Sequence, residues 1–276
     1  MLVMAPVAMA TVVMAWSPLE LTPIGHIESC FGEKFATPRQ GALVPDARAT
    51  LRLELGDGMD PRAALDGIEE YSHVWLLWSC HLNGHAATQA KVRAPRLRGG
   101  KAGVFATRSP FRPNPVGLSL VRLQGVEGDI LSFSGIDLVD GTPILDVKPY
   151  IPAYDAPTEA LQDTEALRTA SWVDPPGLPV RFSAEATATL LSVANDRRTR
   201  RLLPDAESLR RTLVQALAAD PRPLYRWRRQ QASEGPADYD VAIDGVVARC
   251  RFERQHGEAG GPGSDCVTVI ALSAAG

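Results

Sequence analysis

Residues 104–118 read Val-Phe-Ala-Thr-Arg-Ser-Pro-Phe-Arg-Pro-Asn-Pro-Val-Gly-Leu; they begin in a predicted strand at 103–107 and lead through a loop to another at 118–123. Each of the three prolines fixes its own φ and pushes the residue before it towards extended geometry, so the loop should be stiff. This loop offers an array of donors suited to a charged or hydrogen-bonding ligand: Arg108, Ser109, Arg112 and Asn114. A Pro-rich surface turn without a ligand is the alternative.

The segments on both sides of this loop also have strand character. Leu51, Leu53 and Leu55 alternate with polar residues, which is typical of a half-buried strand. Residues 71–81 form an almost continuous apolar run, which predicts a central strand buried on both faces. Further strands are expected at 24–29, 130–134 and 144–147, with one helix over 60–70 that Asp60 caps and Pro61 starts. This succession predicts a mainly β, antiparallel barrel or sandwich.

The second half of the chain has a different pattern. Helices are expected at 183–191 and 205–219, and in the second of these one face carries Leu209, Leu213, Ala216 and Leu217. A hairpin turning at Asp244-Gly245 and a strand at 267–272 complete a small α+β domain. The expected organisation is an apolar, disordered extension over 1–16, a barrel domain over 17–155, a linker over 156–179 and an α+β domain over 180–276.

Composition restricts the class of protein. The formal net charge of -3 and the pI near 6.0 argue against a globally basic nucleic-acid binder. The four cysteines form no Cys-x-x-Cys pair, so neither a zinc site nor a disulfide framework is indicated, and reduced thiols in a cytoplasmic protein are expected. No glycine-rich Rossmann motif, P-loop or Gly-x-Ser-x-Gly motif occurs.

Charge is unevenly distributed along the chain. Residues 71–126 contain no Asp or Glu but hold Lys91, Arg93, Arg96, Arg98, Lys101, Arg108, Arg112 and Arg122. Such a local excess predicts a positive surface for a phosphate-bearing partner, with a solvated basic face as the alternative.

Carboxylates and histidines supply further candidates. Asp140 precedes Gly141 and is expected to form a turn, whereas Asp137 and Asp146 lie in strand-like surroundings. A buried acid needs a partner, which Arg108 or Lys148 could provide; it could equally hold a ribose hydroxyl or accept a proton. The spacing of His81 and His85 would suit zinc on a helix, but the apolar run favours a strand.

Five segments taken together resemble one known family. They are Ile24-Gly25 with Glu33–Gly41, Tyr71–Trp75, Arg93–Gly100, Gly103–Gly117 and Asp137–Tyr150. In order and density they resemble the TsaA-like (TrmO) tRNA methyltransferases over residues 22–155, and Asp220–Tyr225 resembles the C-terminal domain of that family.

This resemblance implies a β-barrel, not a Rossmann fold, that uses S-adenosyl-L-methionine. The implied reaction methylates N6 of threonylcarbamoyladenosine beside the anticodon of tRNA. It also implies a homodimer with its active site near the subunit interface. From the sequence itself a cytoplasmic protein with no membrane association is expected.

The resemblance assigns roles residue by residue. Asp137 would be the base or a cofactor anchor, Asn114 would orient the purine and Arg108 would lie close to the chemistry. The implied cofactor site comprises Gln40, Gly41, Ala42, Cys80, His81, Arg108, Leu118, Ser134, Gly135, Ile136 and Asp137. The implied tRNA contacts are Arg93, Arg96, Arg98, Lys101, Phe111 and Arg112, with Phe111 either stacking on a base or packing in the core.

Two other functions remain open at this level. One is a non-catalytic RNA-binding module that uses the basic stretch 91–112. The other is a metalloenzyme built on His81 and His85, although the resemblance implies no metal.

Overall fold

The structure is a computed structural model, and it describes residues 19–84, 89–94, 97, 100–156, 168–173, 177–196, 202–223, 226, 228, 236–255 and 264–275. The expected extension over 1–16 lies outside the described residues, as does most of the expected linker over 156–179. No helix among the described residues combines the length and the apolar character needed to span a membrane.

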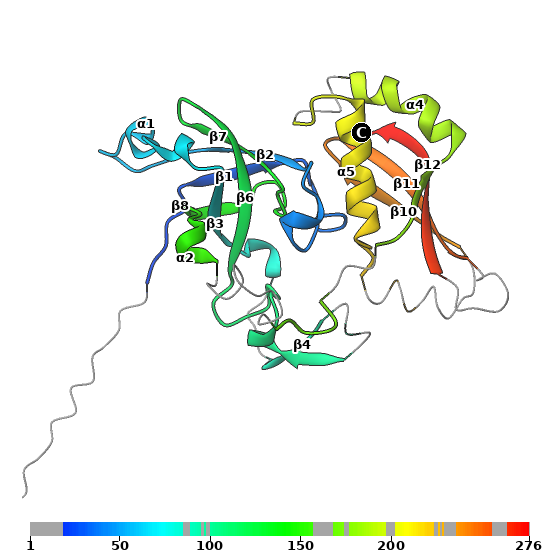
Figure 1. Cartoon of the computed structure of the whole chain (residues 1–276), viewed down its shortest axis with the longest axis horizontal. Helices are drawn as coiled ribbons and strands as arrows, with labels where there is room; N and C mark the ends of the chain where they lie inside the picture. Colours follow the sequence, from blue (N-terminus) through cyan, green and yellow to red (C-terminus); the bar gives the residue numbers. More distant parts are fainter. Residues whose placement is uncertain are drawn as a thin grey trace, which may run out of the picture.

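Six antiparallel strands close into a barrel in the first half of the chain (Figure 1). Around the barrel the strands follow the order β1-β2-β7-β6-β3-β8. Their bounds are β1 Gly25–Ser29, β2 Arg48–Arg52, β3 His73–Ser79, β6 Val116–Glu127, β7 Ile130–Ser134 and β8 Pro143–Pro149. The predicted antiparallel barrel is therefore confirmed.

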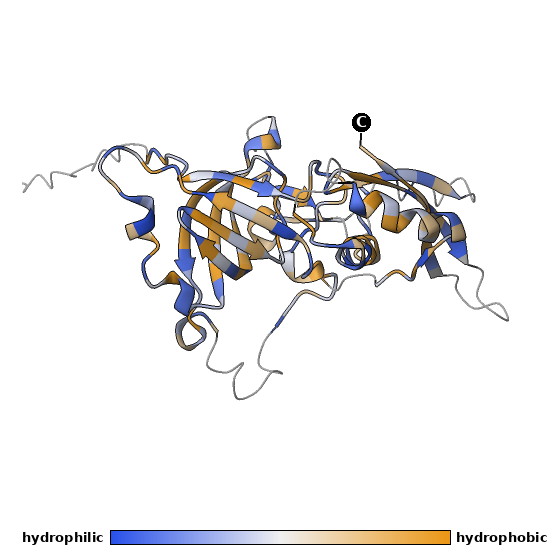
Figure 2. Cartoon of the chain, turned by 90° about the horizontal axis from the view of Figure 1, so that it is seen from above, coloured by the Kyte–Doolittle hydropathy of each residue, from blue (hydrophilic) through white to orange (hydrophobic). Residues whose placement is uncertain are grey.

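Alternate side chains of these strands fill the barrel. Ile27, Leu51, Leu76, Leu131 and Phe133 are each at most 1% exposed and come from β1, β2, β3 and β7. Figure 2 shows hydrophobic and hydrophilic residues alternating along the strands. A barrel of this size has room inside only for side chains, so its interior is a packed core.

Three predicted strands differ from the structure. In β3 only Val74 and Leu76 are fully buried, because the outer face of a closed barrel is not covered, so burial on both faces was wrong. The strand expected at 51–55 is β2, which starts earlier and ends at Arg52. The strand expected at 103–107 is instead the end of β5, Lys101–Gly103, followed by the 3-10 turn Val104–Ala106 (η5). Both the N–H and the hydroxyl of Thr107 donate to the Val104 carbonyl, which closes that turn.

The predicted helix over 60–70 is two short pieces. Asp60 accepts a hydrogen bond from the Arg62 N–H at 3.0 Å and caps α1, Pro61–Ala64. The 3-10 turn Ile68–Glu70 (η2) follows. After β8 the chain forms one further turn, α2, Pro152–Asp155, which the sequence pattern did not predict.

One end of the barrel collects three long connections. Because neighbouring strands are antiparallel, β1, β3 and β7 all end at the same rim. The connections that leave it span residues 30–47, 80–115 and 135–142. They contain the 3-10 turns Gly41–Leu43 (η1) and His81–Asn83 (η3) and the small hairpin of β4, Lys91–Arg93, and β5. Nearly all candidate site residues are therefore brought to one end of the barrel.

The second half of the chain is a four-stranded sheet in the order β10-β11-β12-β9, with two helices beside it (Figure 1). The elements are β9 Val180–Phe182, α4 Ala184–Asn195, α5 Ala206–Ala218, β10 Ala237–Ile243, β11 Val246–Gln255 and β12 Ser264–Ala274. Both predicted helices and the hairpin at Asp244-Gly245 are confirmed.

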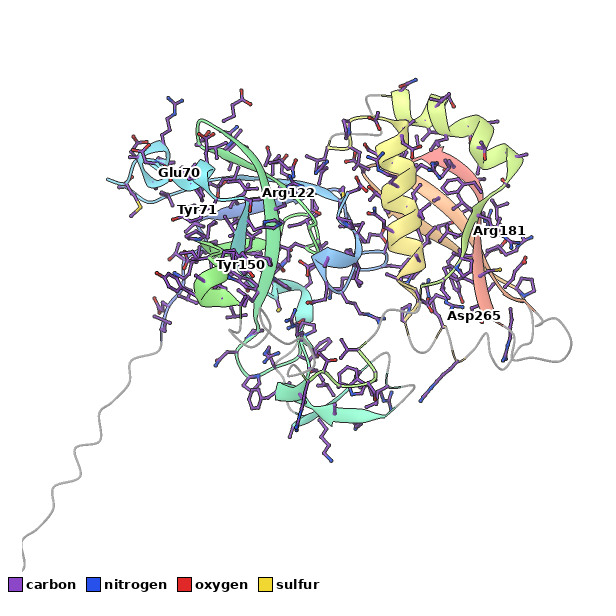
Figure 3. The ribbon with its side chains drawn as sticks, viewed as in Figure 1. Glu70, Tyr71, Arg122, Tyr150, Arg181 and Asp265 are labelled. Carbon is purple, nitrogen blue, oxygen red and sulfur yellow. The ribbon has the colours of Figure 1, made fainter. Side chains whose placement is uncertain are left out.

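A buried arginine ties the end of α5 to this sheet. Arg222 donates to Asp220 at 2.7 Å and to Asp265 of β12 at 2.8 Å, and its guanidinium lies over the Phe252 ring. Figure 3 labels Asp265 on β12. Since a buried charge without a partner is strongly destabilising, the motif Asp220-Pro-Arg222 has a structural role here.

Candidate functional site

Two of the three rim connections meet backbone to backbone. A Cβ atom added to Gly41 would lie 1.9 Å from the Gly135 carbonyl oxygen, so only glycine permits this approach. Gly135 itself has φ of +71° and donates its N–H to the Ala47 carbonyl at 3.0 Å. The structure thus joins residues 40–42 and 134–137, two segments of the expected cofactor site that lie far apart in sequence.

Asp137 lies at this junction, in an irregular segment after β7 and not in a strand. Its Oδ1 accepts a hydrogen bond from the Ser119 hydroxyl at 2.6 Å. The Ser119 oxygen in turn accepts from the Trp78 indole N–H at 3.0 Å. The Gly41 N–H also donates to the carboxylate. Asp137 is therefore oriented from the barrel interior on one side and by the 30–47 connection on the other.

Burial raises the pKa of the Asp137 carboxyl to about 6. The hydrogen bonds from Ser119 and from backbone N–H groups, together with the positive charge of Arg108, oppose this rise but do not cancel it. A carboxyl with this pKa is ionised near neutral pH and still basic enough to accept a proton, as general-base catalysis requires.

Arg108 connects the Pro-rich loop to the same junction. Its guanidinium donates to the Gln40 side chain, and its charge acts on Asp137. The side chain remains exposed. Of the two partners that the sequence offered for Asp137, Arg108 is the one whose charge acts on this carboxyl, whereas Lys148 pairs with Asp146 at 2.7 Å.

Other expected cofactor residues differ in what they present. Ala42 is exposed. Ile136 is fully buried in the core, and the Ser134 hydroxyl accepts from Gln124 Nε2 at 2.8 Å. For Ile136 and Ser134 the backbone is therefore the part left for a ligand.

The remaining candidates flank the Pro-rich loop. The Cys80 N–H donates to the Pro115 carbonyl at 2.8 Å, and His81 follows on the surface. Leu118 is 51% exposed and points out of the barrel. Asn114 is also exposed, and in the part of the chain that the structure describes no hydrogen bond joins its side chain to Asp137.

Basic residues concentrate on the β4–β5 hairpin. Arg93 lies directly opposite Lys101 in the antiparallel pair, Lys91 shares a face with Arg93, and all three are exposed. Like charges placed opposite each other repel, so this arrangement favours a polyanionic partner. Arg96 and Arg98 lie outside the described residues. Arg122 is on β6, well away from the hairpin (Figure 3).

Two predicted tRNA contacts belong to the loop itself. Arg112 donates to the Thr107 carbonyl at 3.1 Å and to the Ser109 carbonyl at 3.4 Å, so part of its hydrogen-bonding capacity braces the loop. Phe111 is 38% exposed, and its N–H donates to the Ser109 hydroxyl. Phe111 is thus partly available for stacking.

Ser119 and Trp78 were absent from the sequence-based site. In the segment Leu118–Val121 the leucines face outward while Ser119 is 4% exposed and faces inward. A serine that faces inward needs a hydrogen-bond partner, and this need could have marked Ser119 as a site residue. The apolar residues around it made the segment look like an ordinary strand. Gly117 leaves space for the Trp78 ring, because a Cβ at this position would lie 2.1 Å from it.

No cluster of three potential metal ligands occurs among the described residues. His85 lies outside them, so the proposed pair with His81 has no described geometry.

The fold and the site define a class of protein: a closed antiparallel β-barrel, unlike a Rossmann domain, with a polar site centred on one carboxylate at its rim. Residues 26–156 match the family model described as the tRNA-methyltransferase O N-terminal domain. The chain belongs to this TrmO family.

Relatives and a solved structure extend the match beyond the barrel. A Pseudomonas aeruginosa protein named as a putative S-adenosylmethionine-dependent methyltransferase, RcsF, is 46% identical over 75% of this chain and 83% of its own length. An Escherichia coli tRNA (adenine(37)-N6)-methyltransferase is 39% identical over 76% of this chain and 85% of its own. The crystal structure of TrmO from P. aeruginosa superposes with a TM-score of 0.67 and 35% identity, covering 95% of this chain and 99% of that one.

Mammalian relatives are longer. The chain spans 36% of the length of the mouse tRNA (adenine(37)-N6)-methyltransferase, at 49% identity.

Proposed function

We propose that this chain transfers a methyl group from S-adenosyl-L-methionine to N6 of the adenosine beside the anticodon of tRNA, adenosine 37. Family membership and the names of its relatives support the reaction class. The observation that carries the proposal is Asp137, a carboxylate oriented by Ser119 and Gly41 at the junction of two glycine-containing segments.

The residues present suit the cofactor. Exposed Arg108 offers a guanidinium for the carboxylate of an amino-acid tail, and the backbone of 40–42 and 134–136 offers donors and acceptors for the adenosine part. When bound, the cofactor would supply a methyl group carried on a sulfonium sulfur. Loss of this methyl group would leave a neutral thioether. The close contact between Gly41 and Gly135 fixes the two backbone segments against which the methyl group and the nitrogen would be aligned.

Asp137 acts as the base in this proposal. We take the substrate to be threonylcarbamoyladenosine, in which N6 is bonded to a carbonyl carbon and is a poor nucleophile. As the C–N bond forms, the N6–H bond breaks and its proton passes to the Asp137 carboxylate. Ser119 holds that carboxylate through its 2.6 Å hydrogen bond, and Asn114, on the stiff Pro-rich loop, orients the purine.

The β4–β5 hairpin supplies the tRNA surface. Lys91, Arg93 and Lys101 are exposed together on it, in a segment that leaves the same barrel rim as the site. Phosphate contacts of this kind position nucleic acid without reading its sequence. Phe111, which is 38% exposed, would stack on an unpaired base of the anticodon loop.

A second copy of the chain is the proposed partner for β6. Its outer face presents a row of exposed apolar residues, Val116, Leu118 and Leu120, beside the site residue Ser119. Covering this row in a homodimer would place the site near the subunit interface. Light scattering should give a dimeric mass for the wild type and a monomeric mass for Leu120→Glu.

We place the reaction in the cytoplasm, where tRNA is found. A tRNA methyl-transfer assay with labelled cofactor tests the proposal. Wild-type protein should label tRNA, and Asp137→Asn should label it about 10²- to 10⁴-fold more slowly, the usual contribution of a general base. Calorimetric heat on adding S-adenosyl-L-methionine separates this function from a pure RNA-binding module. Stoichiometric zinc in the purified protein would favour the metalloenzyme.

A further inference from the structure

The C-terminal domain contacts the barrel domain at the connection between β1 and β2, residues 30–47. The Asp244 N–H, in the β10–β11 turn, donates to the Cys30 carbonyl at 2.7 Å. The Phe35 ring packs edge-on against Tyr239, with centroids 6.2 Å apart, and the Arg226 guanidinium lies 4.8 Å from the Phe35 centroid. These contacts fix the start of the 30–47 connection.

Asp46 fixes the other end of the same connection. Its N–H donates to Gln215 Oε1 at 3.2 Å, and Gln215 Nε2 donates back to Asp46 Oδ2 at 2.6 Å. Arg211 Nη2 donates to Asp46 Oδ1 at 3.2 Å. Arg211 and Gln215 stand four residues apart on α5 and so share one helix face. We call these three residues the Asp46 clasp.

The clasp is built for an ionised carboxylate. Although burial opposes it, hydrogen bonds from Arg211 and Gln215 lower the pKa of Asp46. Each Asp46 oxygen has its own donor, and the backbone N–H is used as well, so position and orientation are both specified.

A short, tightly turned backbone links the clasp to the site. The Val44 N–H donates to the Gly41 carbonyl at 3.0 Å, and the Ala47 N–H donates to the Val44 carbonyl at 3.1 Å. Ala47 in turn accepts from Gly135. Displacing Asp46 would therefore displace Gly41, the residue whose N–H donates to Asp137.

We propose that the C-terminal domain is a positioning element for the cofactor site, and that the Asp46 clasp holds Gln40 and Gly41 against Asp137 and Arg108. The inference rests on the proposed function for its cofactor. Asp46, Arg211 and Gln215 are positioning residues, because they act through the 40–42 segment and not on the reacting atoms.

Variants of the full-length chain test the clasp. Gln215→Ala and Asp46→Ala should each weaken S-adenosyl-L-methionine binding about tenfold in calorimetry, since each removes hydrogen bonds to a charged group. The double variant should be no weaker than the worse single variant, because both changes break one unit.

Arg210→Ala is the matched control. It removes an arginine from the same helix whose partner is Glu207, at 2.8 Å on the surface, and should leave cofactor affinity unchanged. Amide hydrogen exchange gives a readout that needs no cofactor: Gln215→Ala should speed exchange at residues 41–47, and Arg210→Ala should not.

The outcomes separate the two proposals. Unchanged exchange at 41–47 in Gln215→Ala, or a lower melting temperature with unchanged cofactor affinity, would overturn the positioning role. Absence of cofactor binding by the wild type would instead contradict the proposed function, while the exchange data would still decide whether the clasp holds the segment.

Discussion

Replacing Asp137 by Asn should change stability in a pH-dependent way as well as abolish most activity. The carboxyl has an ordinary pKa of 3.8 and a pKa of about 6 in the folded chain, because burial disfavours its charge. Each unit of difference corresponds to about 1.36 kcal/mol, so ionised Asp137 costs about 3 kcal/mol of folding free energy.

The sign of the effect follows from proton binding. At pH below 3.8 both folded and unfolded chains carry the protonated acid, and the cost is absent. Asp137 ionises near pH 3.8 in the unfolded chain but only near pH 6 in the folded chain. Stability therefore falls as pH rises between these values, and it levels off once the folded chain is ionised as well. The amide side chain of the Asp137→Asn variant carries no charge at any pH, so the variant lacks this pH-dependent contribution.

The assay is denaturant unfolding of wild type and Asp137→Asn at about pH 4.5 and about pH 7.5. About 2 kcal/mol of the 3 kcal/mol falls within this interval, so the wild type should lose about that much stability relative to the variant. Any hydrogen bond that the amide makes poorly with Ser119 or Gly41 is common to both pH values and cancels. A stability difference that is independent of pH would refute the reasoning.

Activity should follow the same group. The wild-type rate at saturating substrates should rise with pH and level off above about pH 6, the pKa of Asp137. Asp146→Asn, which removes a carboxylate paired with Lys148 on the barrel surface, is the control and should keep the wild-type rate and profile.

Three further changes test separate parts of the site. Ser119→Ala removes a hydrogen bond that favours ionised Asp137, so the midpoint of the pH–rate profile should move up by about one unit; an unmoved midpoint would contradict the role of Ser119. Gly41→Ala should weaken cofactor binding by about tenfold or more in calorimetry, because its Cβ would meet the Gly135 oxygen at 1.9 Å, and affinity equal to that of wild type would count against the junction as the binding site. Arg93→Ala with Lys101→Ala should reduce the slope of log affinity for tRNA against log salt by about 1.4, at unchanged cofactor affinity, and an unaltered slope would remove the hairpin from the tRNA surface.

Local patterns predicted the regular elements well. The strand at 130–134 has the predicted bounds, and the face of α5 formed by Leu209, Leu213, Ala216 and Leu217 is buried as expected. Period-two alternation and helix caps are properties of a few neighbouring residues, so a sequence can reveal them.

Long-range packing set the parts that could not be predicted. Trp75 and Leu77 remain partly exposed because β3 belongs to a closed barrel, which only strand pairing reveals. Ser119 was hidden in an apolar run whose leucines turned out to face outward. The clasp joins Asp46 to Gln215, 169 residues further along the chain, and no local pattern signals such a contact.

The most direct test of the central claim is mass spectrometry of nucleosides from tRNA incubated with purified protein and methyl-labelled S-adenosyl-L-methionine. We predict that one labelled methyl group appears on threonylcarbamoyladenosine, on the base at N6, and that Asp137→Asn abolishes most of the signal while Asp146→Asn retains it. Label confined to another nucleoside, or no label despite measurable cofactor binding, would contradict the account.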